Sequence, residues 1–292
     1  MSVLSSVSRR GNLQHGQPHS RPLRWYAYPI FKAASLVVVV VCLMGPIVWM
    51  ILGSLKTTVD IYNASHMFAF TPTMSNYGTV FGTANFLPII WNSIVVGGAS
   101  TGLSLLLGLP AAYAVSRFAM HRVARSMLAA RIIPGISLLV PWYYVFYQLR
   151  LVGSYAALIL SHMFLSVPLI IWLLVSFFDN LPQDLEEAAE VDGATAIGAF
   201  MRIALPLSMP GVATAGILAF VFSWNNFMFS MVLSGPHTET LPVALLGFTG
   251  YASIDWGGLM AASVVVSMPI MVLAFFAHKY VVSGLTTGAS IG

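Results

Sequence analysis

Charged residues are scarce in this sequence. Only 8% of its 292 residues are Asp, Glu, Lys or Arg, whereas a soluble domain carries about a quarter. Hydrophobic residues make up 58% of the chain, and the mean hydropathy is +0.84. The single cysteine, Cys42, lies in an apolar run, so no disulfide framework exists. This composition predicts a chain that lies mostly inside a membrane.

Several kinds of chemistry are missing as well. None of the lysines follows a glycine in a loop that could cradle phosphate, which excludes ATP hydrolysis on this polypeptide. Every Asp and Glu lies at or beyond the end of an apolar run, which disfavours an ion-coupled carrier. Basic residues form no patch with aromatic residues, so nucleic-acid binding is not expected. The sequence shows no catalytic, cofactor or metal site, and we do not expect an enzyme.

One short string imitates a catalytic motif. Residues Gly98 to Gly102 match the letters G-x-S-x-G, which in hydrolases form a nucleophile elbow between a strand and a helix. Here the string lies within an apolar run, where that turn cannot form. Small residues four apart instead let two membrane helices approach closely. We therefore interpret Gly98 and Gly102 as helix-packing residues.

Six apolar runs are each long enough, at about twenty residues, for a helix that crosses a bilayer. They cover residues 33–55, 91–114, 126–148, 156–178, 209–233 and 257–281. We predict an all-α polytopic membrane protein with six transmembrane helices in a domain at 33–281. Residues 1–32 are expected to form a basic, flexible tail, and residues 282–292 a second tail.

The lysines and arginines predict the orientation, because they concentrate in cytoplasmic segments of membrane proteins. With the N-terminus in the cytoplasm, the outer segments hold only Lys56 and Arg150, and Arg131 lies within the third run. The other ten basic residues are then cytoplasmic: Arg9, Arg10, Arg21, Arg24, Lys32, Arg117, Arg122, Arg125, Arg202 and Lys279. We expect both termini in the cytoplasm of a bacterial or archaeal cell.

The segment between the fourth and fifth runs, residues 179–206, is called the acidic loop below. It holds six of the nine carboxylates: Asp179, Asp184, Glu186, Glu187, Glu190 and Asp192. Pro182 suits the first turn of a short helix, and Gly193 can end that helix in a left-handed conformation. A second short helix is expected from Thr195 to Arg202. The charge pattern alone leaves two alternatives open, a solvated connector or a helix that enters a cation-lined groove of a partner.

The letters of the acidic loop resemble a known motif. Glu187-Ala188-Ala189, Asp192-Gly193-Ala194 and Leu205-Pro206, with Phe200, Ile203 and Pro210, resemble the EAA motif of binding-protein-dependent ABC importer permeases. Residues 131–136 with Val140-Pro141, and residues 224–227, resemble the third and fifth helices of that family. The ending from Lys279 to Ala289 is similar to its sugar-uptake, maltose-type branch. Asn226 departs from the Glu common in that branch, and Ser290-Ile291-Gly292 departs from its basic ending.

This resemblance implies a fold and a set of partners. The fold is the transmembrane domain of a type I ABC importer, with a permease core at about 87–281. The acidic loop is a coupling helix in a cleft of a cytoplasmic ABC ATPase dimer, and ATP and Mg are bound by that dimer, not by this chain. The other implied partners are a second homologous permease in a heterodimer, an extracytoplasmic solute-binding protein or lipoprotein, and membrane lipid. The implied solute is a sugar; a glycerol phosphodiester or a polyol is the alternative, and a proton-coupled carrier a remote one.

The resemblance also assigns candidate residues. The ATPase-coupling residues are Glu187, Ala188, Ala189, Asp192, Gly193, Ala194, Phe200, Pro206 and Pro210. Ile197, Phe200 and Ile203 are expected to anchor the second short helix. The candidate contacts with a binding protein are Glu239, Leu241 and Pro242. The candidate pore or gate residues are Arg131, Tyr143, Trp224, Asn225 and Asn226.

Overall fold

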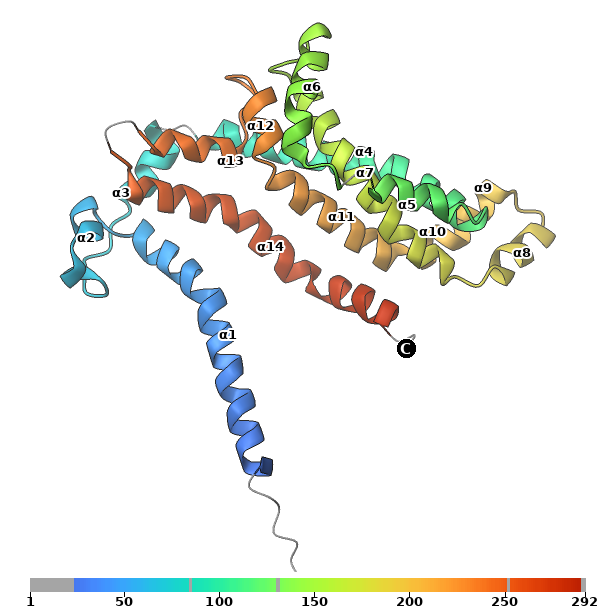
Figure 1. The fold of residues 1–292 in the computed structure, drawn as a ribbon, viewed down its shortest axis with the longest axis horizontal. Coiled ribbons are helices and arrows are strands. Elements are labelled where there is room, and N and C mark those ends of the chain that lie inside the picture. The colour runs from blue at the N-terminus through green and yellow to red at the C-terminus, as the bar shows by residue number, and fades with distance from the viewer. Residues whose placement is uncertain (1–23, 84–85, 130–131, 251–252, 290–292) are drawn as a thin grey trace, which may run out of the picture. The chain divides into compact units, whose positions relative to one another are not determined.

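The computed structural model describes residues 24–83, 86–129, 132–250 and 253–289 (Figure 1). Within those residues nearly every ordered element is a helix, and the only extended pairing is a bridge between Thr249 and Ile254. The chain divides into two units, one up to Trp49 and one from Met50 onward. The all-α prediction is confirmed.

The first unit consists of most of helix α1, Arg24–Ser54. The helix begins at Arg24, so it includes the end of the segment predicted as a tail; residues 1–23 lie outside the described residues. From Phe31 to Ser54 it is long and apolar enough to cross a membrane. Its valines and leucines are exposed along most of this length. An apolar surface on all sides is what a helix in lipid requires.

Long helices form the second unit: α4 (Phe86–Arg117), α7 (Tyr155–Asp179), α11 (Met209–Trp224) and α14 (Trp256–Ala289). Each matches a predicted apolar run, and α7 does so to within one residue at each end. Helix α14 extends into the segment predicted as a C-terminal tail, and residues 290–292 lie outside the described residues.

Helices α4 and α7 pack closely because small residues lie between them. A β-carbon at Gly108 of α4 would lie 2.6 Å from Cγ2 of Ile170 in α7, so only glycine fits there. The predicted packing pair Gly98 and Gly102 is different. Both are exposed, and a β-carbon on either would meet nothing within 4 Å, so neither glycine makes a close helix approach to another described residue. The neighbouring Gly97 is buried against the ring of Phe220 instead.

The prediction of six continuous transmembrane helices is not confirmed. The third run is divided into α5 (His121–Ala129) and α6 (Gly135–Gln148). Pro134 immediately precedes α6, and a proline lacks the N–H that would continue a helix. Among the described residues, four helices have the length and composition to span a membrane: α1 from Phe31, α4, α7, and α14 from Trp256 to Phe275.

The fifth run is also interrupted. Helix α11 ends at Trp224, and α12 (Met228–Leu233) follows as a separate short helix. The segment Ala196–Leu207 meets α11 at an angle of 76°, so counting that bent pair as one span raises the number of spans to five.

The remaining elements are short. They are α2 (Thr58–Tyr62), η1 (Ala64–His66), α3 (Ser75–Gly78), η2 (Thr79–Thr83), α8 (Asp184–Val191), α9 (Ala196–Ala199), η4 (Phe200–Ala204), α10 (Leu205–Leu207), α13 (Leu241–Ala244) and η5 (Leu245–Phe248). Four of them, α8 to α10 and η4, build the acidic loop, and α13 and η5 lie within the connection that joins α12 to α14.

Candidate functional site

The acidic loop folds as two short helical segments with a sharp turn between them (Figure 1). Helix α8 begins at Asp184, so Pro182 lies just before it rather than in its first turn. Asp184, Glu186 and Glu187 occupy the first turn, where the helix dipole favours negative charge. Gly193 follows the helix with a φ of +90°, which confirms the predicted left-handed turn.

The second segment begins with a cap and continues into a buried aromatic residue. The Thr195 hydroxyl accepts a hydrogen bond from the Gly198 N–H at 3.1 Å. Phe200 is buried, and its ring lies 4.7 Å from that of Tyr113 in α4 and 6.2 Å from that of Phe178 in α7. The predicted anchoring role of Phe200 agrees with this contact.

The other two predicted anchors behave differently. Ile203 is half-buried, but Ile197 is 73% exposed. The prediction for Ile197 is therefore wrong within this chain. Helix α9 is only one turn long, and its buried residue is Ala199, which leaves the larger isoleucine outside.

A charged cluster joins the acidic loop to the long helices. Glu186 is the only buried residue of α8. Its carboxylate accepts hydrogen bonds from the Arg117 guanidinium at the end of α4 and from the Tyr113 hydroxyl one turn earlier. The Arg117 Nε lies 3.1 Å and 3.2 Å from the two carboxylate oxygens. This bidentate geometry is the strong form of an arginine–carboxylate pair.

The same arginine reaches a third element. Arg117 Nη1 donates to the backbone carbonyl of Phe178 at the end of α7, at 2.9 Å. Next to it, the Ser116 hydroxyl donates to Asp179 at 2.5 Å. We call Tyr113, Ser116, Arg117, Asp179 and Glu186 the arginine cluster. It connects α8 with the ends of α4 and α7.

Two opposed effects act on the pKa of Glu186. Burial favours the neutral acid and raises the pKa, but the hydrogen bonds from Arg117 and Tyr113 and the charge of Arg117 outweigh burial. The net result is a pKa below the ordinary value, so the carboxylate is ionised at neutral pH. The arginine cluster therefore contains an intact ion pair.

The opposite side of the acidic loop is open. Glu187, Ala188, Asp192 and Gly193 are exposed, and Ala189 and Ala194 are half-buried. Large apolar side chains accompany them, among which Val191 is 88% exposed and Ile197 73%. Pro206 at the end of the loop and Pro210 in the first turn of α11 are exposed as well. An exposed surface that mixes apolar groups with carboxylates is typical of a site for another protein.

Sequence reasoning missed Glu186, Arg117 and Tyr113 as site residues. The motif includes Glu187, the residue after Glu186, and the Glu187 side chain is exposed. The partners of Glu186 lie 69 and 73 residues earlier in the chain, so no local spacing relates them. The one available signal is the i, i+4 spacing of Tyr113 and Arg117, which places both on one face of a helix.

The loop between α12 and α14 lies at the other end of α4. The Asn92 side-chain amide donates to the backbone carbonyls of His237 and Glu239 at 3.1 Å and 2.9 Å. The Ser93 hydroxyl accepts from the Leu241 N–H at 2.8 Å. Because α4 holds the acidic loop at residues 113–117 and this loop at 92–93, the two loops lie at opposite ends of the helix.

The predicted contacts with a binding protein are only partly accessible. Leu241 is fully buried, so its side chain is unavailable to a partner; it packs in the core with Phe248. Glu239 and Pro242 are half-buried, whereas Pro236 and His237 are exposed. Glu239 and Asp255 line a hollow of about 520 Å³ at this end.

Comparison with known proteins decides the family. A family model described as "Binding-protein-dependent transport system inner membrane component" matches residues 104–287, which is more than half of the chain. The chain belongs to this family. The permease is therefore a multi-pass transport component of a membrane and not an enzyme.

Two relatives match the permease over most of its length. The sulfoquinovosyl glycerol transport system permease protein SmoH of Agrobacterium fabrum is 37% identical over 93% of this chain and 94% of that protein. The trehalose/maltose transport system permease protein MalG of Thermococcus litoralis is 34% identical over 88% of this chain and 95% of that protein.

Two solved structures share the fold. One is a bacterial ABC transporter involved in the import of the acidic polysaccharide alginate, with a TM-score of 0.74 and 19% identity over 90% of this chain and 99% of that chain. The other is the MetNI methionine ABC transporter, with a TM-score of 0.54 and 20% identity over 67% and 94%. The permease therefore has the fold of an ABC importer transmembrane domain.

Inside the permease, a neutral polar cluster joins four helices. The Nδ1 atom of His162 in α7 lies 2.7 Å from the Ser223 hydroxyl of α11, and that hydroxyl lies 2.9 Å from the Ser100 hydroxyl of α4. The other ring nitrogen lies 3.4 Å from the Ser230 hydroxyl of α12. All four residues, called the serine–histidine cluster below, are buried. His162 is thus a polar contact between helices.

The candidate pore residues of the permease do not form one site. Arg131 lies outside the described residues. Trp224 is only 2% exposed, and its indole N–H donates to the Val266 carbonyl at 3.1 Å, so it is a core residue. Tyr143 is 41% exposed, and its ring stacks on that of Tyr147 at 6.2 Å.

The two asparagines, Asn225 and Asn226, make local hydrogen bonds. The Asn225 amide donates to the Val221 carbonyl of its own helix at 2.9 Å. The Asn226 side-chain oxygen accepts from the Phe229 N–H of α12 at 3.1 Å. Both side chains satisfy backbone groups where α11 ends and α12 begins, which explains the interruption there.

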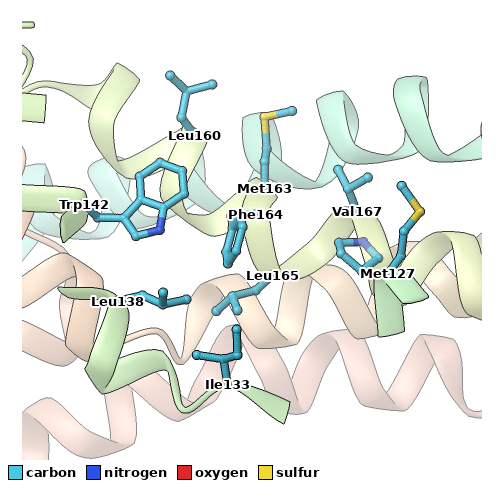
Figure 2. Close-up of a pocket in the computed structure, with 10 residues that line it drawn as sticks. Met127, Ile133, Leu138, Trp142, Leu160, Met163, Phe164, Leu165 and Val167 are labelled. Atoms are coloured by element: carbon cyan, nitrogen blue, oxygen red, sulfur yellow. The ribbon is translucent and has the colours of Figure 1, made fainter. Parts of the chain in front are cut away.

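The permease also has an apolar groove of about 410 Å³ along α5, α6 and α7. Figure 2 shows the Trp142 indole and the side chains of Phe164, Met163 and Leu160 turned toward one hollow. Except for the Trp142 indole N–H, the lining side chains offer no hydrogen-bonding group. A solute rich in hydroxyl groups would lose its hydration there without replacement, so the groove does not suit a sugar.

Proposed function

We propose that this permease is one subunit of an ABC importer that carries a sugar, in particular a disaccharide or oligosaccharide, across the cytoplasmic membrane. The names of the relatives support the sugar, because sulfoquinovosyl glycerol, trehalose and maltose all contain a glycosyl unit. In this proposal residues 33–281 form the transmembrane domain, and both termini and the acidic loop are cytoplasmic.

The proposal rests on one observation about the acidic loop. One side of the loop is exposed, and the other side is bound to α4 and α7 through the arginine cluster. Its exposed residues suit contact with an ATPase, and the arginine cluster behind them suits the transfer of movement to the long helices. The sequence contains no phosphate-binding loop, so the energy for uphill transport comes from another chain. We propose an ABC ATPase dimer as that partner.

Two further partners belong to the proposal. One is a second homologous permease subunit, which forms a heterodimer with this chain. An extracytoplasmic binding protein delivers the sugar to the opposite end of the helices, where His237 and Glu239 lie. The dimer of ATPase subunits draws together on binding ATP and moves the acidic loop, which switches the long helices between inward-facing and outward-facing states.

The proposal is tested by the energy source of uptake. Proteoliposomes that contain the complete complex, with binding protein outside, should accumulate labelled trehalose or maltose only when ATP is enclosed. A protonophore should leave this uptake unchanged. Uptake that needs a proton gradient and ignores internal ATP would contradict the proposal.

A substitution at the turn tests the coupling site. Gly193 has a φ of +90°, which a β-branched residue adopts only with strain, so Gly193→Val should abolish uptake and loosen the bound ATPase while membrane insertion is kept. Gly45→Val is the control, because Gly45 lies in a helix with nothing within 4 Å of an added β-carbon. Normal uptake by the Gly193 variant would rule out this coupling site.

A further inference from the structure

We infer that Arg117 and Glu186, assisted by the Tyr113 hydroxyl, are positioning residues that make the acidic loop move together with α4 and α7. This inference rests on the proposed function and names the contact that transmits the movement. The residues act through α8, and none of them belongs to the exposed surface offered to an ATPase.

Burial shows that α8 depends on this contact. The side chains of Arg117 and Glu186 are only 12% and 9% exposed, and every other residue of α8 is exposed or half-buried. The hydrophobic core reaches the acidic loop only on either side of α8, at Leu181 before it and at Phe200, Ala204 and Leu205 after it. One carboxylate is thus the only buried side chain by which α8 is attached.

The geometry of Arg117 fits a role in transmission. One guanidinium binds the carboxylate of α8 through two nitrogens and the last turn of α7 through a third, while its backbone forms the end of α4. A planar group with several donors resists rotation in a way that one hydrogen bond does not. A force applied to the exposed side of α8 therefore reaches α4 and α7 at once.

Loss of the Arg117–Glu186 pair should separate ATP hydrolysis from sugar uptake. The exposed side of α8 would keep its residues and could still bind the ATPase, which would continue to hydrolyse ATP. Helix α8 could then tilt without moving α4 and α7, and hydrolysis would no longer drive uptake. Damage to the exposed surface, as in Gly193→Val, would instead reduce ATPase binding and uptake together.

The experiment compares Glu186→Gln, Arg117→Gln, the double variant and Tyr113→Phe in the complete reconstituted complex. Tyr113→Phe keeps the ring that packs on Phe200 and removes only the hydroxyl. Glu190→Gln is the matched control, because Glu190 lies one helical turn after Glu186 and is exposed. The measurements are ATPase subunits per permease, the rate of ATP hydrolysis, sugar taken up per ATP, and the thermal unfolding midpoint.

We expect Glu186→Gln and Arg117→Gln to retain bound, active ATPase and to lose about tenfold or more in sugar taken up per ATP, since misplacing a working group by about 1 Å has effects of this size. The double variant should lose no more than either single variant, because both remove one interaction. Tyr113→Phe should show a smaller loss of the same kind, and Glu190→Gln none.

Two results would overturn the inference. One is a wild-type ratio of sugar to ATP in both Gln variants. The other is a parallel loss of uptake, hydrolysis and folded complex, which would mean that the pair only stabilises the fold. Wild-type uptake without any need for ATP would overturn the proposed function itself, and so differs from either result.

Discussion

The arginine cluster and the serine–histidine cluster both join α4 to α7, but they use different chemistry. At the end of the helices the link is an ion pair between Arg117 and Glu186. Within the helices it consists of neutral groups, in which His162 and the hydroxyls of Ser100, Ser223 and Ser230 lie within hydrogen-bonding distance. Glu186 and Ser116 of the arginine cluster are buried, as is every member of the serine–histidine cluster, so burial alone does not explain the choice.

The difference follows from the surroundings of each cluster. A charge within the hydrocarbon region costs several kcal/mol, whereas hydroxyl and imidazole groups can satisfy each other there at little cost. At the end of a helix an arginine can reach water and backbone carbonyls, so an ion pair is tolerated and gives a stronger, more directional link. The stronger interaction, the ion pair, is thus found at the helix ends, where we propose that the ATPase moves the acidic loop. The weaker, neutral hydrogen bonds are found within the helices, where they only hold neighbouring helices in register.

Reversing the charge in the arginine cluster should have the largest effect. Arg117→Glu would place a third carboxylate beside Glu186 and Asp179, and breaking a buried pair in this way costs about 3–5 kcal/mol. The thermal midpoint of the purified protein in detergent should fall well below that of the wild type. Arg122→Glu, at an exposed position in the neighbouring α5, is the control. Equal midpoints for the two variants would show that the arginine cluster adds nothing to stability.

Removing a hydroxyl from the serine–histidine cluster should have a smaller effect. Ser223→Ala would leave His162 Nδ1 and the Ser100 hydroxyl without this partner, and such bonds are worth about 0.6–1.7 kcal/mol in membrane proteins. Ser104→Ala is the matched control, because Ser104 is also buried in α4 but its hydroxyl has no hydrogen-bond partner among the described residues. A larger loss for Ser104→Ala in the same unfolding assay would contradict this assignment of the network.

We expect the smallest effect from a change of pH, through the contribution of the Arg117–Glu186 pair to thermal stability. The pKa of Glu186 is lower in the folded protein, so its contribution to stability is complete above its ordinary value of 4.5 and is lost as the pH falls through the folded pKa. The difference in midpoint between wild type and Glu186→Gln should be constant at neutral pH and shrink in acid. Arg117→Gln should show the same trend, since it removes the same pair. If the difference in midpoint instead grew as the pH fell, the pKa of Glu186 would be raised rather than lowered by folding, and the assignment of the ion pair would be contradicted.

Much of the fold followed from sequence patterns alone. The apolar runs predicted α4, α7 and α14, and Gly193 predicted the turn after α8. The third and fifth apolar runs were each predicted as one continuous helix, but each is divided into two. Apolar composition does not show where a helix is interrupted. Pro134 immediately precedes α6, and Asn225 and Asn226 lie between α11 and α12, although each predicted run continues across its break.

The functional site was predicted less completely. The motif located the acidic loop and its exposed side, where Glu187, Ala188 and Asp192 lie. It did not predict that Leu241 and Trp224 would be buried, because loop residues and helix ends carry no periodic pattern that separates inner from outer positions. It also gave no indication that the groove beside Trp142 would be lined almost entirely by apolar side chains.

The sequence by itself determined that this is a helical membrane protein, that it carries the motif of an importer family, and that none of its lysines follows a glycine in a phosphate-binding loop. Only the tertiary structure decided which of two adjacent glutamates is the internal one. Glu186 and Glu187 share the same chemistry and differ by about 100° around a helix. Their environments diverge because Arg117, 69 residues away, lies on one side of α8 and leaves the other side open. A sequence records neighbours along the chain, whereas burial and charge pairing depend on neighbours in space.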